Sequence, residues 1–215
     1  MTVRRVDLGE VPYPQAMDEM AGWVAQRRAE TAGDRLFLLT HPPVITYGRR
    51  TPASELPAAS GIPAVPADRG GYATYHGPGQ LVGYLVVKLG SGKPGQLVRW
   101  VETRLIAAMA ELGFTTYRRD TEPGGKSLVG VWAPGERKLA SVGMRIRDGI
   151  SSHGFAVNID PEMSVFRAFT VCGLPDVTMT SLAELAREQG RRTPGGPAVS
   201  DAVAAAFDAP VPWQA

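Results

Sequence analysis

Apolar residues recur along the chain in two spacings, which together predict a mixture of strands and helices. Segments 36–39, 44–47 and 81–89 are short apolar runs between turn-forming residues, and such runs predict buried strands. Elsewhere the apolar residues stand three and four positions apart, which predicts one amphipathic helix after Pro14 and another from Pro94 to Gly113. Further strands are expected at 3–8, 115–118, 128–133, 139–147 and 152–158, and short helices at 163–169, 181–188 and 200–207.

The order of these elements predicts an α+β fold. Strands dominate the middle of the chain and helices lie before and after them, so we expect a mixed β-sheet flanked by helices. The chain has 215 residues, of which 44% are hydrophobic and 20% charged, which suits one large globular domain or two small ones. We expect a single catalytic domain over residues 1–215, with a weak candidate linker at 191–197 before the last helix.

Composition and charge exclude several classes of protein. A net charge of +2 is too small to indicate nucleic-acid binding. No segment approaches the roughly 18 apolar residues that span a membrane, and the first residues lack the apolar stretch of a signal peptide. One cysteine permits neither an intramolecular disulfide nor a cysteine-cluster metal site, and His41, His76 and His153 are not spaced as zinc ligands. We therefore expect a cytoplasmic protein with no bound metal.

The single cysteine, Cys172, is a candidate nucleophile. A thiolate is the strongest nucleophile that an unmodified side chain offers near neutral pH, although a free cysteine also serves as a small buried apolar residue. His76 or His153 could form a Cys–His pair with it, which is the commoner way to activate a thiol. The ammonium group of Lys138 could instead stabilise the thiolate by charge. The spacing of these residues leaves both arrangements open.

The glycine-rich run 69–80 is the second candidate for chemistry. Glycines let a backbone approach a ligand closely and adopt left-handed conformations. The run is not a phosphate-binding loop, because it lacks the Gly-Lys-Ser/Thr ending and leads into a strand. A hairpin with tight turns is the structural alternative. Arg69, Thr74, Tyr75 and His76 stand among the glycines, however, and a purely structural turn has no need of them.

Two other polar residues allow a functional and a structural interpretation, and two more are expected to be structural. Lys138 opens an apolar strand, where a lysine is usually solvated unless its ammonium group faces the thiol. His153 could orient a substrate or satisfy a hydrogen bond in the core. Asn158 is expected in a turn, and His41, before two prolines, is expected to be structural.

Five segments, in chain order, resemble the pattern of the lipoyl(octanoyl) transferases. They are 69–81 (Arg-Gly-Gly-x-x-Thr-Tyr-His-Gly-Pro-Gly-Gln-Leu), 130–132 (Gly-Val-Trp), 138–143 (Lys-Leu-Ala-x-Val-Gly), 153–158 (His-Gly-Phe-Ala-x-Asn) and 172–173 (Cys-Gly). His41-Pro42 and Gly48-Arg49 also fit the family. The resemblance runs from about residue 36 to 185, and the stretch after Arg191 carries no matching motif.

The resemblance implies the fold of the biotin and lipoate protein ligases. It also implies transfer of an octanoyl group from octanoyl-acyl carrier protein to a specific lysine. That lysine would belong to a lipoyl domain of a 2-oxoacid dehydrogenase complex or to the glycine cleavage H protein. A thioester donor is already activated, so no ATP or other cofactor is expected. The resemblance also points to a monomer, and the charge and hydropathy described above predict no binding to nucleic acid or membranes.

The resemblance also assigns roles to residues. Cys172 would be the nucleophile that carries the acyl group as a thioester, and Lys138 would lower the pKa of its thiol and exchange protons. The acyl-binding residues would be Arg69, Gly70, Gly71, Tyr72, Ala73, Thr74, Tyr75, His76, Ser141, Val142, Gly143, Gly154, Phe155 and Ala156. We expect the alkyl chain to lie against Val142, Phe155 and Tyr75, and backbone N–H groups near His76 to hold the developing oxyanion.

Two other functions remain as alternatives. One is an ATP-dependent lipoate or biotin protein ligase on the same fold, which needs an adenylate-binding loop and no nucleophilic cysteine. The other is a non-catalytic module that binds lipoyl domains or carrier proteins, which would form no covalent acyl adduct.

Overall fold

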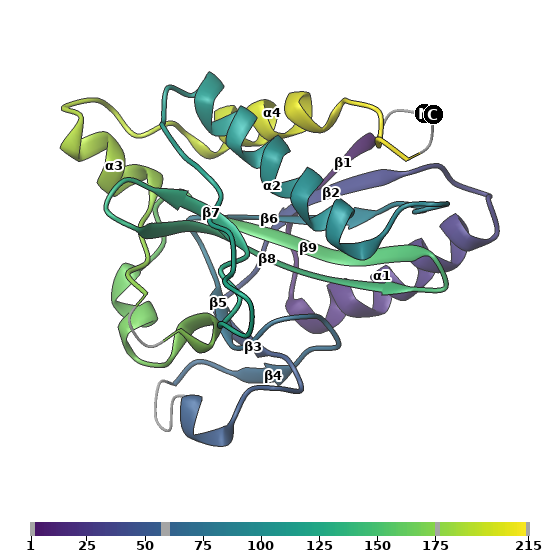
Figure 1. The fold of residues 1–215 in the computed structure, drawn as a ribbon, viewed down its shortest axis with the longest axis horizontal. Helices are drawn as coiled ribbons and strands as arrows, with labels where there is room; N and C mark the ends of the chain where they lie inside the picture. Colours follow the sequence, from purple (N-terminus) through teal and green to yellow (C-terminus); the bar gives the residue numbers. More distant parts are fainter. Residues whose placement is uncertain (1–2, 57–60, 175–176, 214–215) are drawn as a thin grey trace.

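The computed structural model describes residues 3–56, 61–174 and 177–213, and of Cys172 it describes the backbone alone. Its centre is a six-stranded sheet in which β1 is parallel to β2 and the other neighbours are antiparallel (Figure 1). The strands, in spatial order, are β1 (Arg4–Glu10), β2 (Arg35–Thr40), β6 (Gln80–Val86), β9 (Ile150–Asn158), β8 (Arg137–Arg147) and β7 (Gly130–Ala133). The mixed sheet expected from the sequence is confirmed.

Helices cover both faces of this sheet, with α2 and α4 on one face and α1 on the other (Figure 1). They are α1 (Tyr13–Arg28), α2 (Pro94–Glu111) and α4 (Gly196–Phe207). Successive side chains of β2 alternate between the two faces, as a strand requires. Leu36 and Leu38 pack in the core beneath α2 and α4, whereas Phe37 and Leu39 pack in the core beneath α1. The short apolar run at 36–39 is therefore buried on both faces.

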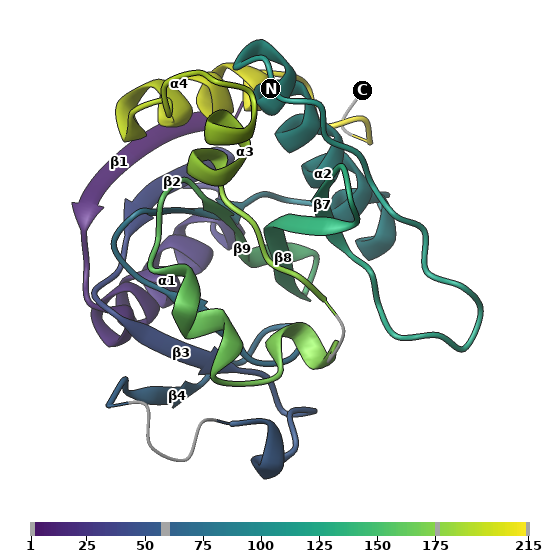
Figure 2. The same cartoon turned by 90° about the vertical axis from the view of Figure 1, so that its left-hand side faces the viewer.

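A second, three-stranded sheet lies beside the large one, in the order β4-β3-β5 (Figures 1 and 2). Its strands are β4 (Ala64–Pro66), β3 (Val44–Tyr47) and β5 (Thr74–His76). Only β3 was expected. The other two are three residues long, and they fall in segments where proline and glycine dominate the pattern. This small sheet holds the glycine-rich run in place, because β5 pairs with β3.

Two expected elements differ from the prediction. The strand expected at 115–118 is reduced to a single bridge between Tyr117 and Trp132 at the edge of β7. The helix expected at 163–169 is the 3₁₀ helix η2 (Met163–Arg167). The remaining short helices are η1 (Ala53–Glu55), η3 (Val171–Gly173) and α3 (Leu182–Glu188). Ser181 caps α3 by accepting a hydrogen bond from the Glu184 N–H.

The C-terminal helix belongs to the main hydrophobic core. Val199, Val203 and Phe207 of α4 are buried there, and the Phe207 ring meets Trp100 of α2 edge-on at 5.2 Å. The expected weak linker at 191–197 is hydrogen-bonded at its start to the residue range just after α2, because the Arg191 guanidinium donates to the Gly113 carbonyl at 2.9 Å. None of the helices in the described ranges is long and apolar enough to cross a membrane.

A buried ion pair joins α1 to the large sheet. Arg27 Nε donates to Asp34 Oδ1 at 2.6 Å, and the same oxygen accepts the Lys88 N–H at 3.0 Å. Both charged side chains are almost fully buried. One carboxylate therefore links the end of α1, the start of β2 and the segment just after β6.

We predict that Arg27→Ala lowers the free energy of unfolding by about 3–5 kcal/mol, because it leaves the Asp34 carboxylate buried without its main partner. The neighbouring Arg28 pairs with Asp148 at the surface and provides the matched control. Arg28→Ala should cost at most about 1 kcal/mol. Urea unfolding of both variants measures the difference, and equal losses would contradict this account of the pair.

Candidate active site

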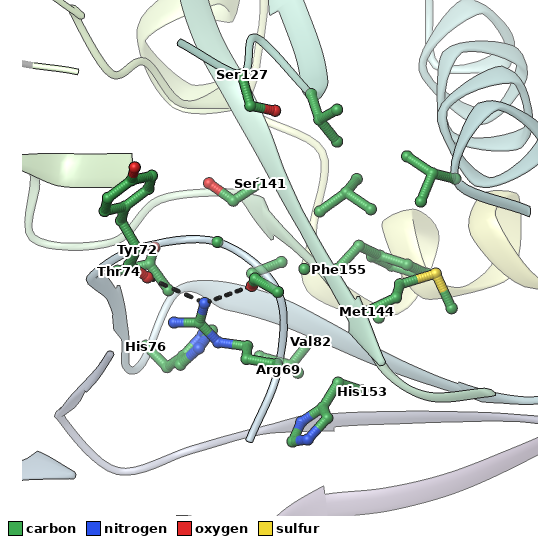
Figure 3. A pocket seen from close by; sticks show the side chains of 18 of the residues that line it. Arg69, Tyr72, Thr74, His76, Val82, Ser127, Ser141, Met144, His153 and Phe155 are labelled. Carbon is green, nitrogen blue, oxygen red and sulfur yellow. Dashed lines mark hydrogen bonds between the residues drawn. The ribbon is translucent and has the colours of Figure 1, made fainter. Parts of the chain in front are cut away.

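A cavity of about 210 Å³ lies where β8 and β9 of the large sheet meet the glycine-rich run (Figure 3). Strands β6, β9 and β8 run side by side along one wall, and Gly83, Phe155 and Val142 share one cross-strand row of this wall. A Cβ at Gly83 would lie 2.1 Å from the Phe155 ring, so only glycine leaves room for this ring on its neighbour strand. The wall that results is largely apolar.

Most of the acyl-binding residues expected from the sequence line this cavity. They are Arg69, Gly70, Gly71, Tyr72, Thr74, His76, Ser141, Val142, Gly143, Gly154, Phe155 and Ala156. Lys138 lines it as well. Segments that lie far apart in the sequence therefore surround one space, although their contact with an acyl group stays a prediction.

Ala73 and Tyr75 are not among the lining residues. Side chains alternate along β5, so Thr74 and His76 face the cavity and Tyr75 faces away. The Tyr75 ring packs edge-on against Phe166 at 5.6 Å, in a separate hydrophobic cluster. The structure therefore does not bring Tyr75 into this cavity, although it was expected to contact the alkyl chain.

Several lining residues were not expected from the sequence. They are Tyr13, Arg50, Val82, Tyr84, Val98, Ser127, Val129 and Met144. Val82 and Tyr84 could have been found, because they alternate along a predicted strand that pairs with the 153–158 motif. Met144 lies on β8, within the strand predicted at 139–147, and the others come from loops or helices whose distance from the motifs is set only by tertiary packing.

Arg69 fastens the glycine-rich run to the small sheet. Its guanidinium donates to the Thr46 carbonyl and hydroxyl oxygens at 2.8 Å. It also donates to the Gly70 and Tyr72 carbonyls at 3.0 Å (Figure 3). On the other side of the run, the Gly70 N–H donates to the Met144 carbonyl of β8 at 3.0 Å. The backbone of the run thus lies directly against the cavity wall, where side chains would not fit.

His76 belongs to a buried hydrogen-bond network. Its Nδ1 lies 3.0 Å from Gln80 Oε1, and its Nε2 lies 3.2 Å from the Thr46 hydroxyl. Gln80 Nε2 donates to Asn158 Oδ1, and Asn158 Nδ2 donates to the Thr180 carbonyl, both at 2.9 Å. Burial lowers the pKa of His76 to about 3. Asn158, expected in a turn, therefore links β9 to the segment before α3.

The other two histidines are also buried. His153 lines the cavity in a left-handed conformation (φ 59°), and burial, reinforced by Arg69 and Arg145, lowers its pKa to about 4. A non-glycine residue held at such a φ within a strand is strained. His41 bridges the Val11 carbonyl and the Tyr84 hydroxyl, each at 2.6 Å, so its expected structural role is confirmed.

Lys138 is buried, with 2% of its surface exposed, so it is not a solvated lysine at a strand end. Its Nζ lies 5.4 Å from the centre of the Trp132 ring, a cation–π contact. Its backbone N–H donates to the Thr178 carbonyl at 2.8 Å, and its carbonyl accepts the Thr180 N–H at 3.0 Å. The segment that follows the cysteine is therefore hydrogen-bonded beside Lys138.

Cys172 lies in η3, and its side chain is outside the described residues. The next residue, Gly173, has a φ of 66°, and a Cβ there would lie 2.9 Å from the ring of the cavity-lining Tyr72. The preceding residue, Val171, is buried in the cluster that contains Phe166. The backbone around the cysteine therefore runs beside the cavity wall. The separation of its Sγ from Lys138 Nζ also falls outside what the structure describes.

Solved structures of ligases share this fold. A lipoate-protein ligase A bound with ATP superposes with a TM-score of 0.74 at 16% identity, over 96% of this chain and 84% of that chain. A biotin protein ligase from Leishmania major superposes with a TM-score of 0.53 at 10% identity, over 96% and 73% of the two chains. At such low identity these likenesses concern the fold alone.

Curated relatives are much more similar in sequence. A protein from Acidothermus cellulolyticus named octanoyltransferase is 45% identical, over 83% of this chain and 80% of its own length. One from Rhodococcus opacus with the same name is 40% identical, over 95% and 81% of the two chains. The model of the lipoyl protein ligase A/B catalytic domain matches residues 12–208. The chain belongs to the lipoyl protein ligase A/B catalytic domain family.

Proposed function

We propose that this protein is an octanoyltransferase, which moves an octanoyl group from a thioester donor through Cys172 to a lysine of a lipoyl domain. The observation that carries the proposal is the position of Lys138, whose buried side chain lines the same cavity as the family motifs. Gly173, next to the cysteine, packs against Tyr72 of that cavity. The names of the relatives at 40–45% identity support the same reaction.

The proposed reaction has two steps. In the first, the Cys172 thiolate attacks the donor's thioester carbonyl, the bond from that carbonyl to the donor sulfur breaks, and the donor leaves as a thiol after taking up a proton. In the second, the amine of the acceptor lysine attacks the octanoyl-Cys172 thioester, so an amide forms and the Cys172 thiol is released. Lys138 exchanges protons in both steps, and its charge favours the Cys172 thiolate before the first step and again when the acyl group leaves in the second.

The protonation state of His76 and His153 favours Lys138, rather than a histidine, as the group that activates the Cys172 thiol. An imidazole stabilises a thiolate by charge only when it is protonated. Burial holds the pKa of His76 and His153 at about 3 and about 4, so both are neutral near pH 7. Both ring nitrogens of His76 also contact other protein groups. Of the partners considered for the thiol, Lys138 is therefore the one that can stabilise the thiolate by charge.

The apolar wall provides the binding energy for the alkyl chain. Each methylene group removed from water contributes about 0.8 kcal/mol, so binding depends on chain length. Val142 and Phe155 face the cavity and would contact the chain. The donor we propose is octanoyl-acyl carrier protein. The acceptors are lipoyl domains of 2-oxoacid dehydrogenase complexes and the glycine cleavage H protein. We also propose that the protein acts as a cytoplasmic monomer.

An ATP-dependent lipoate ligase is the second candidate, because the fold resembles that of a ligase bound with ATP. Incubation with a lipoyl domain separates the two. Modification from octanoyl-acyl carrier protein without ATP supports the transferase. Modification only from lipoate with ATP would favour the ligase.

We predict that the protein gains the mass of one octanoyl group when it is incubated with octanoyl-acyl carrier protein. The adduct should be removed by neutral hydroxylamine, as thioesters are, and it should be absent in Cys172→Ala. Intact-protein mass spectrometry measures both results. Normal transfer to a lipoyl domain by Cys172→Ala would refute the covalent mechanism, whereas absence of any adduct in the wild type would favour the non-catalytic binding module.

Replacing Lys138 with methionine should slow octanoyl transfer by at least about 100-fold, because acid–base catalysis of this kind contributes 10²–10⁴-fold. Alkylation of Cys172 by iodoacetamide should also require a higher pH, because the thiolate loses its nearby positive charge. Lys126, an exposed lysine outside the cavity lining, gives the control Lys126→Met. An alkylation profile that is the same in Lys138→Met and wild type would count against the proposed role.

The neutral histidines make a further prediction about stability. In the unfolded chain a histidine has a pKa of about 6.5, so below that pH the unfolded state binds more protons than the folded state. The free energy of unfolding should therefore fall as the pH is lowered from about 6.5 towards 4, by up to about 1.4 kcal/mol per pH unit for each buried histidine.

Urea unfolding at several pH values measures this slope. His153→Asn removes one of these histidines, and asparagine tolerates the left-handed backbone at this position. The variant should show a shallower slope than the wild type. Stability that stays constant over this pH range would mean that the histidines carry charge in the folded protein.

A further inference from the structure

Buried charges are rare in the described part of the chain. Arg27, Asp34, Glu102 and Lys138 are the charged side chains buried there. Arg27 and Asp34 pair with each other. That leaves Glu102 of α2 and Lys138 of β8, neither of which has a partner that explains why its charge is buried.

One glycine connects the two. Glu102 Oε1 accepts the Gly130 N–H at 2.8 Å, and this hydrogen bond is buried. On its other side Gly130 contacts the lysine: a Cβ there would lie 2.5 Å from Lys138 Cε and 3.3 Å from Lys138 Nζ. The φ of Gly130 is 142°, a conformation that side-chain-bearing residues rarely adopt. The end of the Lys138 side chain therefore lies against the Gly130 backbone, and Glu102 anchors that backbone by a hydrogen bond.

The charge of Glu102 is not needed for the hydrogen bond. A neutral glutamine could accept the same N–H, and burying a carboxylate costs several kcal/mol more than burying an amide. Burial raises the pKa of the Glu102 carboxyl, while the Gly130 N–H and the positive charges of Arg118, Arg99 and Lys138 oppose that rise. A buried negative charge this close to a buried ammonium group stabilises the protonated lysine.

We propose that Glu102 is a positioning residue for Lys138, anchoring the Gly130 peptide against which the ammonium group rests and supplying the negative charge that favours its protonated state. The inference rests on the proposed function, because it assigns Glu102 a part in the proton exchange of Lys138. Glu102 itself is not a lining residue of the cavity, so it acts through the lysine rather than on the acyl group.

Other charged groups surround this pair, and the charges of Arg118 and Arg99 act on the Glu102 carboxyl as the charge of Lys138 does. Arg99 and Arg118 both lie near the exposed Asp120, at 3.5 and 3.6 Å. Arg119 stacks on the Trp132 ring, which Lys138 also contacts, and pairs with Glu136 at 3.2 Å. From the α3 side, Glu184 accepts the Thr180 hydroxyl at 2.9 Å.

Glu102→Gln tests the charge while it keeps an oxygen for the Gly130 N–H. We expect kcat for octanoyl transfer to fall, KM for the acyl carrier protein to stay unchanged, and the alkaline limb of the pH–rate profile to move down by about one pH unit or more. Glu111→Gln is the matched control, because Glu111 lies on the same helix and is exposed. It should behave as the wild type does.

A second measurement needs no variant at position 102. In Lys138→Met the pKa of the Glu102 carboxyl should rise, because the nearby ammonium group is gone, and the Glu111 carboxyl should titrate as before. Carbon-13 NMR of the labelled glutamate side chains follows both titrations. This readout responds to charge coupling and not to a purely structural role of Glu102.

The outcomes separate the two proposals. If wild type transfers octanoyl groups but the Glu102→Gln profile overlays the wild-type profile, the role of Glu102 is refuted and the proposed function stands. If the Glu102 titration is the same with and without Lys138, the coupling is refuted, whether or not Glu102→Gln folds. If wild type forms no acyl-enzyme while the titrations shift, the proposed function fails and the coupling remains.

Discussion

The burial of one ammonium group governs the arrangement of this site. Lys138 is the first inward-facing residue of β8, and its Nζ rests between the Trp132 ring and the backbone of Gly130. A buried lysine is costly unless the surroundings favour its charge. Here the Trp132 ring and the buried Glu102 carboxylate favour the charge of Lys138. The lysine also lines the cavity in which we propose that the acyl group binds.

The large sheet brings the other parts to this lysine. Strands β6, β9 and β8 pair in register, so motifs separated by dozens of residues in the sequence stand in adjacent rows of one wall. Gly83 leaves room for the Phe155 ring, Gly143 leaves room for the backbone of the glycine-rich run, and Gly154 leaves room for the backbone of β6. Arg69 then fastens that run to the small sheet. The opposite wall of the cavity therefore contains the backbone of Gly70 and Gly71 beside the side chains of Arg69, Tyr72 and His76.

Much of the fold could be predicted from the sequence because apolar spacing reports burial directly. The run at 36–39 and the helix from Pro94 are examples, and both are confirmed within a residue or two. Strands β4 and β5 could not be predicted, since three residues among prolines and glycines show no period. The strand expected at 115–118 failed because Tyr117 alone pairs with the edge of β7.

Site residues that belong to sequence motifs could be predicted, whereas those that only tertiary packing brings to the cavity could not. The cavity is lined by Lys138 and by most of the residues that the family resemblance indicated. Tyr75 was misplaced because the resemblance names positions without saying on which side of a strand they lie. Glu102 gave no signal at all, since it follows Trp100 and Val101 in what reads as an ordinary amphipathic helix.

The most direct test of the central claim is an experimental structure of the octanoyl-enzyme. It should show the thioester sulfur of Cys172 within about 4–6 Å of Lys138 Nζ, the range in which a cation favours a thiolate, with the alkyl chain along the wall that contains Val142 and Phe155. A sulfur that faces away from the cavity, with protein between it and the lysine, would contradict the account.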